Sequence, residues 1–147
     1  MRLELTKRAD YGIRAAVALA AAAPGDRLSV RRIAEEQSIP VRFLTQVMVD
    51  LVGAGLVEAR PGRTGGYRLA RPATELTILE VVEAIEGDSR RRTCVLRGGP
   101  CNVAGMCEVH AVFAAAQDGL LAVLGGTSLA TVVAGRSDAI GIGRRSA

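Results

Sequence analysis

Residues 29–51 read SVRRIAEEQSIPVRFLTQVMVDL, and this stretch decides the fold of the 147-residue chain. Ser29 is a favourable N-cap for a short helix over residues 30–37. Pro40 or Val41 then begins a second helix, because proline is favoured in a first helical turn. The apolar positions of that helix follow the i, i+3, i+4, i+7 pattern of one buried face: Leu44, Val47, Met48 and Leu51. Two short helices joined by a tight turn predict a helix-turn-helix.

The flanking segments extend this motif into a winged helix. Residues 7–23 have a helical apolar pattern that stops at Pro24. After the helix-turn-helix, residues 56–59 and 67–69 read as strands, and the basic, glycine-rich residues 60–66 between them read as a hairpin wing. The order helix, helix, helix, strand, wing, strand is typical of a winged helix.

The second half of the chain predicts a helix, a long loop and a longer helix. The first helix covers residues 78–86, and the loop over residues 87–106 is long enough to be functional or disordered. The second helix covers residues 108–124. It has a wide apolar stripe without an intrachain partner of equal length, so we expect it to pair with its copy in a homodimer. Residues 128–133 read as a short turn.

The predicted fold class is mainly α with a small β-hairpin: a winged helix-turn-helix plus a long C-terminal dimerisation helix. We expect the winged-helix DNA-binding domain over residues 1–75. The helix, the cysteine-bearing loop and the dimerisation helix then occupy residues 76–133. Residues 134–147 are expected to form a flexible tail.

Positive charge is concentrated in the first half of the chain. Residues 1–75 contain 12 Lys or Arg and 8 Asp or Glu, whereas residues 76–147 contain 7 of each, so the whole net charge of +4 lies in the first half. A basic half beside a neutral half predicts that one part meets an anion such as nucleic acid. Double-stranded DNA is the partner that a winged helix would bind.

Other features exclude several classes. The apolar run over residues 15–23 follows a segment with acidic residues, consists mostly of Ala and is too short to span a bilayer. An odd number of cysteines argues against a secreted disulfide scaffold. No phosphate-binding glycine motif or nucleophile–base pair is present, so we do not expect an enzyme. We expect a cytoplasmic protein without membrane association.

The predicted DNA-reading face is the outer side of the second helix of the helix-turn-helix, where Arg42, Thr45, Gln46 and Asp50 are expected. Arg and Gln are suited to reading guanine and adenine edges in the major groove, and wing arginines are suited to phosphates or the minor groove. The expected DNA contacts are Arg8, Arg31, Arg32, Arg42, Thr45, Gln46, Arg60, Arg63 and Arg68.

All three cysteines, Cys94, Cys101 and Cys107, fall within 14 residues of the long loop, and His110 follows three positions later. Thiolates are soft ligands suited to iron–sulfur clusters, zinc or Cu(I). A fourth ligand could come from His110. Zinc is less consistent with this spacing, because structural zinc sites use closer cysteine pairs. A metal-free thiol switch and inert cysteines stay open as alternatives.

Several short motifs together resemble the Rrf-type winged-helix regulators over roughly residues 1–133. The matching residues are Met1-Arg2-Leu3, Leu5-Thr6-Lys7, Tyr11-Gly12-Ile13-Arg14, Ile39-Pro40-Val41-Arg42-Phe43-Leu44, Gly65-Gly66-Tyr67-Arg68-Leu69, Ile78-Leu79-Glu80-Val81-Val82 and the three-cysteine loop. The resemblance implies a homodimer whose DNA affinity depends on an iron–sulfur cluster bound by the three cysteines. It implies a regulator, in our reading a repressor, that responds to redox state, nitric oxide or cluster supply.

The resemblance leaves the fourth ligand open. IscR-like members complete a [2Fe–2S] site with a His three residues after the last Cys, and His110 matches that position. NsrR-like members cap a [4Fe–4S] cluster with an Asp from the first helix of the partner subunit, and Asp10 matches that position. Six residues separate Cys94 from Cys101, one more than in the IscR pattern. We favour His110 slightly, and we keep a zinc-bound or metal-free thiol-switch repressor as the alternative to cluster sensing.

Overall fold

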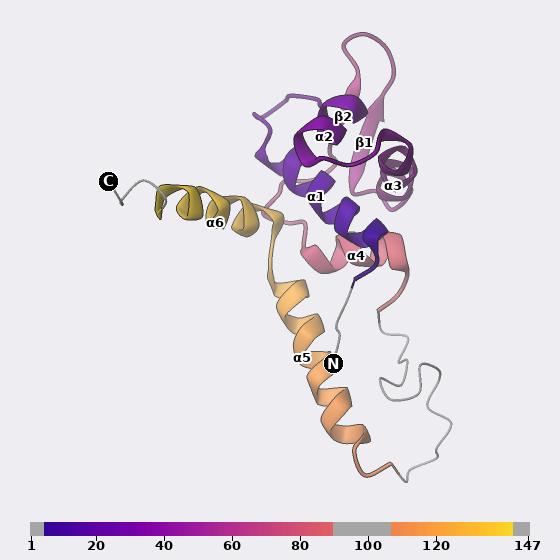
Figure 1. The fold of residues 1–147 in the computed structure, drawn as a ribbon, viewed down its shortest axis with the longest axis vertical. Coiled ribbons are helices and arrows are strands. Elements are labelled where there is room, and N and C mark those ends of the chain that lie inside the picture. Colours follow the sequence, from indigo (N-terminus) through magenta and orange to yellow (C-terminus); the bar gives the residue numbers. More distant parts are fainter. Residues whose placement is uncertain (1–4, 90–106, 143–147) are drawn as a thin grey trace.

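The computed structural model describes residues 5–89 and 107–142 of the chain. Within these residues it is mainly helical, with one two-stranded antiparallel sheet, as the sequence predicts (Figure 1). The elements follow one another in the order α1 (Lys7–Ala21), α2 (Val30–Gln37), α3 (Val41–Gly53), β1 (Val57–Arg60), β2 (Gly66–Leu69), α4 (Ile78–Glu86), α5 (His110–Gly126) and α6 (Leu129–Ile142).

The helix-turn-helix forms where the sequence predicts it. Ser29 caps α2, because its hydroxyl oxygen accepts a hydrogen bond from the backbone N–H of Arg32 at 3.2 Å. Ser38 ends the helix in the left-handed conformation with φ 53°, and α3 begins directly after Pro40. The predicted apolar face of α3 is fully buried: Leu44, Val47, Met48 and Leu51 are each 0% exposed. Hydrophobic burial of this face therefore fixes which side of α3 points outward.

Helix α1 is central to the core and contacts α2, α3, α4 and α6. Its small residues allow close packing, and Gly12 is the closest point. A Cβ atom at Gly12 would lie 2.0 Å from Cδ1 of Ile85 on α4 and 3.6 Å from Cγ1 of Val47 on α3. The small residues of α1, with Gly12 at the closest approach, thus allow α1, α3 and α4 to pack together.

The wing is a hairpin tied to the helical core. Val57 pairs with Leu69 and Arg60 pairs with Gly66, so each strand lies within one residue of its predicted bounds. Tyr67 also exchanges two backbone hydrogen bonds with Leu28, of 2.8 and 2.9 Å, which adds a third short strand contact. This contact anchors the base of the wing beside α2.

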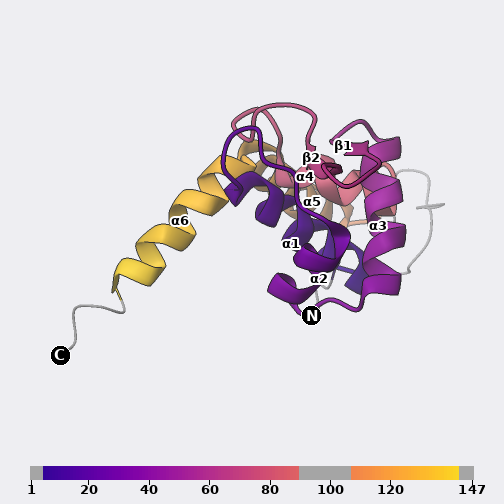
Figure 2. The same cartoon turned by 90° about the horizontal axis from the view of Figure 1, so that it is seen from above.

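Helices α5 and α6 leave the winged helix in different directions (Figures 1 and 2). Their junction is fixed to the start of α4, because Ile78 N–H donates to the Thr127 carbonyl at 3.0 Å and Leu129 N–H donates to the Leu76 carbonyl at 2.8 Å. Leu76 and Leu129 are both fully buried there. No residue of α5 itself is fully buried. None of the described helices has both the length and the apolar character needed to cross a membrane.

The prediction of a short turn over residues 128–133 is wrong, because α6 continues as a helix from Leu129 to Ile142. Ser128 directly precedes this helix, and its hydroxyl oxygen accepts a hydrogen bond from the N–H of Thr131 at 3.1 Å. The glycines at 135 and 141 lower the helix propensity of this segment. Val132 and Val133 pack against the core at its first turns, and this tertiary contact holds the start of the helix.

Candidate nucleic-acid interface and cysteine site

The outward side of α3 is a stripe of Arg42, Gln46 and Val49. A helix turns by about 100° per residue, which places these three positions opposite the buried face of α3. All three are exposed, and Val49 is the most exposed of the large apolar residues on this helix at 58%. Thr45 lies on the flank of the stripe, and its hydroxyl donates to the Val41 carbonyl at 2.9 Å. The predicted DNA-reading residues Arg42, Thr45 and Gln46 are therefore all exposed, two of them within the stripe and Thr45 on its flank.

The prediction that Asp50 belongs to this outer face is wrong. Asp50 is half-buried on the flank of α3, where its carboxylate forms an ion pair with Arg8 of α1. The position that the sequence analysis missed is Val49, one residue earlier. The helical period places Val49 opposite Leu44, Leu51 and their neighbours, but an apolar side chain gives no sequence signal for a position in this outward stripe.

Ion pairs divide the candidate DNA-binding arginines into two groups. Three of them are bound by carboxylates: Arg8 by Asp50, Arg32 by Glu36 at 2.7 Å and Arg68 by Glu58 at 2.8 Å. Four others are exposed and form no ion pair with any residue that the structure describes: Arg31, Arg42, Arg60 and Arg63. Among the candidate DNA-binding arginines that the structure describes, these four carry positive charge that no carboxylate compensates.

Arg27 fixes the wing, and the sequence analysis did not identify it. Its guanidinium donates to the Gly66 carbonyl at 3.3 Å and lies 3.6 Å from the Glu58 carboxylate. The Arg27 side chain is only 15% exposed. It therefore supports the orientation of the hairpin that carries Arg60 and Arg63, and it is not itself available to DNA.

Two of the candidate metal ligands lie at the start of α5. The N–H of His110 donates to the Cys107 carbonyl at 3.0 Å, so the two residues belong to one backbone turn. Cys107 is a free, partly exposed cysteine, and His110 is exposed. Cys94 and Cys101 lie outside the described residues. No group of three possible metal ligands forms among residues 5–89 and 107–135.

Asp10 lies on the surface in the first turn of α1. Its carboxylate accepts a hydrogen bond from Arg14 at 2.9 Å, and its side chain is 53% exposed. Arg14 also donates to the Gln37 carbonyl at 2.7 Å at the end of α2. The exposed position of Asp10 leaves it accessible to a second molecule.

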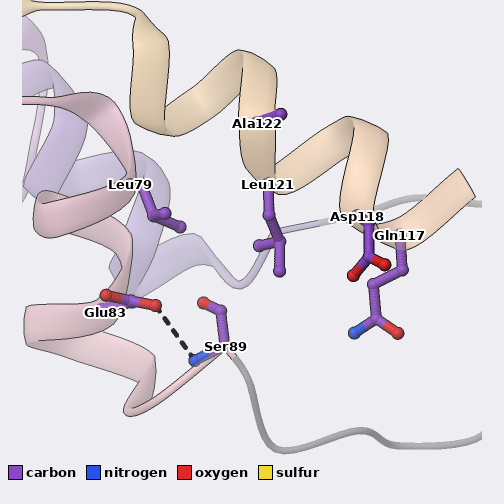
Figure 3. Close-up of a pocket in the computed structure, with 7 residues that line it drawn as sticks. All are labelled: Leu79, Glu83, Ser89, Gln117, Asp118, Leu121 and Ala122. Carbon is purple, nitrogen blue, oxygen red and sulfur yellow. Dashed lines mark hydrogen bonds between the residues drawn. The ribbon is translucent and has the colours of Figure 1, made fainter. Parts of the chain in front are cut away.

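A cavity of about 460 Å³ separates α4 from the middle of α5 (Figure 3). It is lined by Leu79 and Glu83 of α4, by Ser89, and by Gln117, Asp118, Leu121 and Ala122 of α5. The Glu83 carboxylate accepts a hydrogen bond from the Ser89 N–H at 3.3 Å. This bond holds Ser89 on the side of α4 that faces α5 (Figure 3). Ser89 is the last described residue before the segment that contains Cys94 and Cys101.

The comparisons with known proteins agree with this architecture. The profile of the Rrf2 family, described as an iron-dependent transcriptional regulator, matches residues 5–135. The transcriptional regulator NsrR of Bacillus subtilis is 33% identical over 137 residues, which cover 92% of this chain and 94% of NsrR. The transcriptional regulator Rv1287 of Mycobacterium tuberculosis is 40% identical over 85 residues. That match covers 58% of this chain and about half, 53%, of the relative's length.

Solved structures show the same fold. IscR of T. potens superposes with a TM-score of 0.77 at 24% identity, covering 93% of this chain and 90% of that one. CymR, the global cysteine regulator of B. subtilis, superposes with a TM-score of 0.76 at 23% identity, covering 90% of this chain and 98% of that one. These relatives are regulators and not enzymes, as the sequence predicts. The chain belongs to the Rrf2 family of winged-helix, DNA-binding transcriptional regulators.

Proposed function

We propose that this protein is a cytoplasmic repressor that binds an operator as a homodimer and whose affinity is set by an iron–sulfur cluster. The observation that carries the DNA-binding part is the group of exposed, uncompensated arginines on α2, α3 and the wing. Arg42, Thr45 and Gln46 contact base edges, and Arg31, Arg60 and Arg63 contact phosphates or the minor groove. Arg8, Arg32 and Arg68 are secondary phosphate contacts, since each must share its charge with a carboxylate.

Helix α5 supports the homodimer proposal. Val112 and Val123 are 68% and 67% exposed, and Val109 and Leu120 on the same side are exposed as well. Soluble monomers rarely leave a continuous apolar patch in water. Pairing of this face with its copy would cover it, and would also place two winged helices at a fixed separation, as a two-fold symmetric operator requires.

The donor set at the start of α5 fits an iron–sulfur cluster. Cys107 and His110 follow one another within one turn, and the helix N-terminus stabilises negative charge such as a thiolate. A bound cluster supplies a centre that oxidation or nitrosylation can destroy. Cys94, Cys101 and Cys107 would hold it, so that the segment between α4 and α5 keeps one shape. A change in that shape would alter the separation of the two winged helices and hence the DNA affinity.

His110 is our first candidate for the fourth ligand, and Asp10 of the partner subunit is the second. His110 requires no assumption about the dimer. Asp10 would have to exchange its bond with Arg14 for iron, but an exposed ion pair of this kind contributes only about 0–1 kcal/mol. The choice decides between the [2Fe–2S] and [4Fe–4S] patterns of the family.

The test is the ultraviolet–visible spectrum of protein purified without oxygen, with iron and sulfide assays on the same sample. We expect a brown protein with absorbance between about 320 and 460 nm, which is the range of iron–sulfur centres. Substitution His110→Ala or Asp10→Ala then changes the spectrum only where the residue is a ligand. A colourless, iron-free protein after anaerobic reconstitution would contradict the cluster proposal and leave the DNA-binding proposal intact.

A zinc-bound or metal-free thiol switch is the second candidate. It is favoured by the free, partly exposed thiol of Cys107 and by the structural likeness to CymR, the global cysteine regulator of B. subtilis. Zinc would give a colourless protein with about one metal ion per chain. A thiol switch would give a metal-free protein whose DNA affinity responds to oxidants and is restored by a thiol reductant.

A further inference from the structure

An exposed cation–aromatic pair forms the first turn of α3. The guanidinium carbon of Arg42 lies 4.5 Å from the centroid of the Phe43 ring. That separation lies within the range of cation–π attraction, which extends to about 6 Å. Both residues follow Pro40, the N-cap of α3, so the pair occupies the end of the helix that would enter DNA first.

Folding alone gives no reason for either side chain at this place. Phe43 remains 45% exposed, so its ring does not complete the core. Arg42 is a cation near the positive end of the helix dipole, which is unfavourable, and the first turn of α3 has no acidic residue to compensate it. Among the described residues, the Arg42 side chain forms no ion pair or hydrogen bond. A partner outside the chain explains both residues.

The ring restricts where the guanidinium points. Neighbouring residues on a helix are about 100° apart and do not face each other, so Arg42 must lean sideways to cover Phe43. A long, flexible arginine loses rotamer freedom when it binds. Stacking on the ring removes part of that freedom before binding and leaves the planar edge of the guanidinium, with its N–H donors, free to bond.

We propose that Phe43 is a positioning residue that holds Arg42 for a bidentate contact with the edge of an operator guanine. The inference rests on the proposed function, because it requires α3 to lie in the major groove. There guanine presents two acceptors, N7 and O6, which match the fork of a guanidinium. In helix-turn-helix proteins the N-terminal residues of the recognition helix make the base contacts, and Arg42 is the second residue of α3.

The experiment is selection of duplexes from a random DNA library, followed by affinity measurements on the enriched sequence. It uses the full chain both after anaerobic reconstitution with iron and sulfide and after removal of iron. We expect the wild type to enrich half-sites with an invariant guanine. Arg42→Ala lowers the preference for that guanine over the other bases by about 5- to 140-fold. Phe43→Leu, which stays apolar but lacks a ring, lowers it by about 2- to 5-fold.

Two controls separate positioning from a structural role. Phe43→Tyr keeps an aromatic face and is expected to retain the wild-type preference. In the Arg42→Ala background, Phe43→Leu is expected to have no further effect on the guanine position, because the two residues act as one unit. A general loss of folding would instead weaken binding to every sequence equally.

The possible results distinguish a failure of the positioning role of Phe43 from a failure of sequence-specific DNA binding. If Phe43→Leu leaves the guanine preference unchanged, or if no enriched guanine depends on Arg42, the inference is wrong while sequence-specific binding stands. If the wild type enriches no sequence in either form, the proposed function itself fails, and the positioning role of Phe43 fails with it.

Discussion

Glu80 shows how one carboxylate organises the start of a helix. It accepts hydrogen bonds from the backbone N–H of Thr77 at 2.8 Å and from Arg71 at 2.5 Å, and Thr77 in turn caps the Glu80 N–H. Partial burial acts to raise the pKa of Glu80, but the bonds from Arg71 and Thr77 outweigh it and lower the pKa below its ordinary value. The ionised carboxylate is therefore the form that stabilises α4.

Glu80→Gln is expected to lower the free energy of unfolding at neutral pH, because the amide cannot replace the ionised acceptor. A lowered folded pKa gives stability that is present above the unfolded-state pKa and is lost as pH falls through the folded value. The difference between wild type and variant should therefore shrink below about pH 4. Urea unfolding from pH 7 to pH 3.5 measures it. The control is Glu75→Gln at an exposed site, and a pH-independent difference would contradict the prediction.

Arg63 belongs to the uncompensated arginines of the wing. Arg63→Ala is expected to reduce the slope of log affinity against log salt concentration by about 1, because one phosphate contact and its released counterion are lost. Fluorescence anisotropy with a labelled duplex over a series of salt concentrations measures this slope. Arg63→Lys keeps the charge and should retain the wild-type slope. Equal slopes for all three proteins would remove Arg63 from the interface.

Most elements could be predicted from sequence because burial imposes a period on them. The buried faces of α2, α3 and α4 follow from apolar spacing, and the wing follows from its glycines. The ion pairs could not be predicted, since Arg8 and Asp50 are 42 positions apart and meet only after α1 packs on α3. For the same reason the sequence did not show which arginines are compensated. The sequence did not predict α6, because tertiary contacts of Val132 and Val133 hold its first turns and no local pattern reveals such contacts.

The shape of the wing depends on Gly65. A Cβ atom at this position would lie 2.1 Å from the Arg60 carbonyl oxygen and 2.8 Å from that of Pro61. These are backbone atoms and cannot move aside as a flexible side chain could. Gly65→Ala must therefore displace the loop that presents Arg60 and Arg63.

Gly65→Ala is accordingly expected to weaken operator binding severalfold while leaving the helical core folded. Circular dichroism and anisotropy on the same sample separate the two effects. The matched control is Gly53→Ala at the end of α3, where a Cβ atom meets nothing within 4 Å. A wing variant that binds like the wild type would show that the hairpin does not contribute to affinity.

At the scale of the whole molecule, α5 connects the two proposed activities. One end of α5 begins with His110, three residues after Cys107, and the other end is fixed to α4 through the Thr127–Ile78 hydrogen bond. The apolar side between these ends is exposed in the single chain. If a second subunit covers this face, α5 carries both the end of the cysteine segment and the proposed dimer interface. A change in the cysteine site would then shift α5 and alter the arrangement of the two subunits.

Val112→Glu combined with Val123→Glu is expected to convert the proposed dimer to a monomer, because the substitutions would place carboxylates in the apolar interface that we propose for this face. Analytical ultracentrifugation measures the mass directly. Ala111→Glu adds one such carboxylate on the side of α5 turned away from this stripe and should leave the proposed dimer intact. A double variant that still sediments as a dimer would place the interface elsewhere.

In the mechanism that we propose, the state of the cysteine site sets DNA affinity. The most direct measurement is the dissociation constant for one selected duplex, taken by anisotropy under anaerobic conditions before and after iron is removed from the same preparation. A coupled regulator should show affinities that differ by about 5- to 150-fold between the two forms. Equal affinities, with iron content verified in both samples, would rule out regulation by the cysteine site and leave a DNA-binding protein whose cysteines do not regulate it.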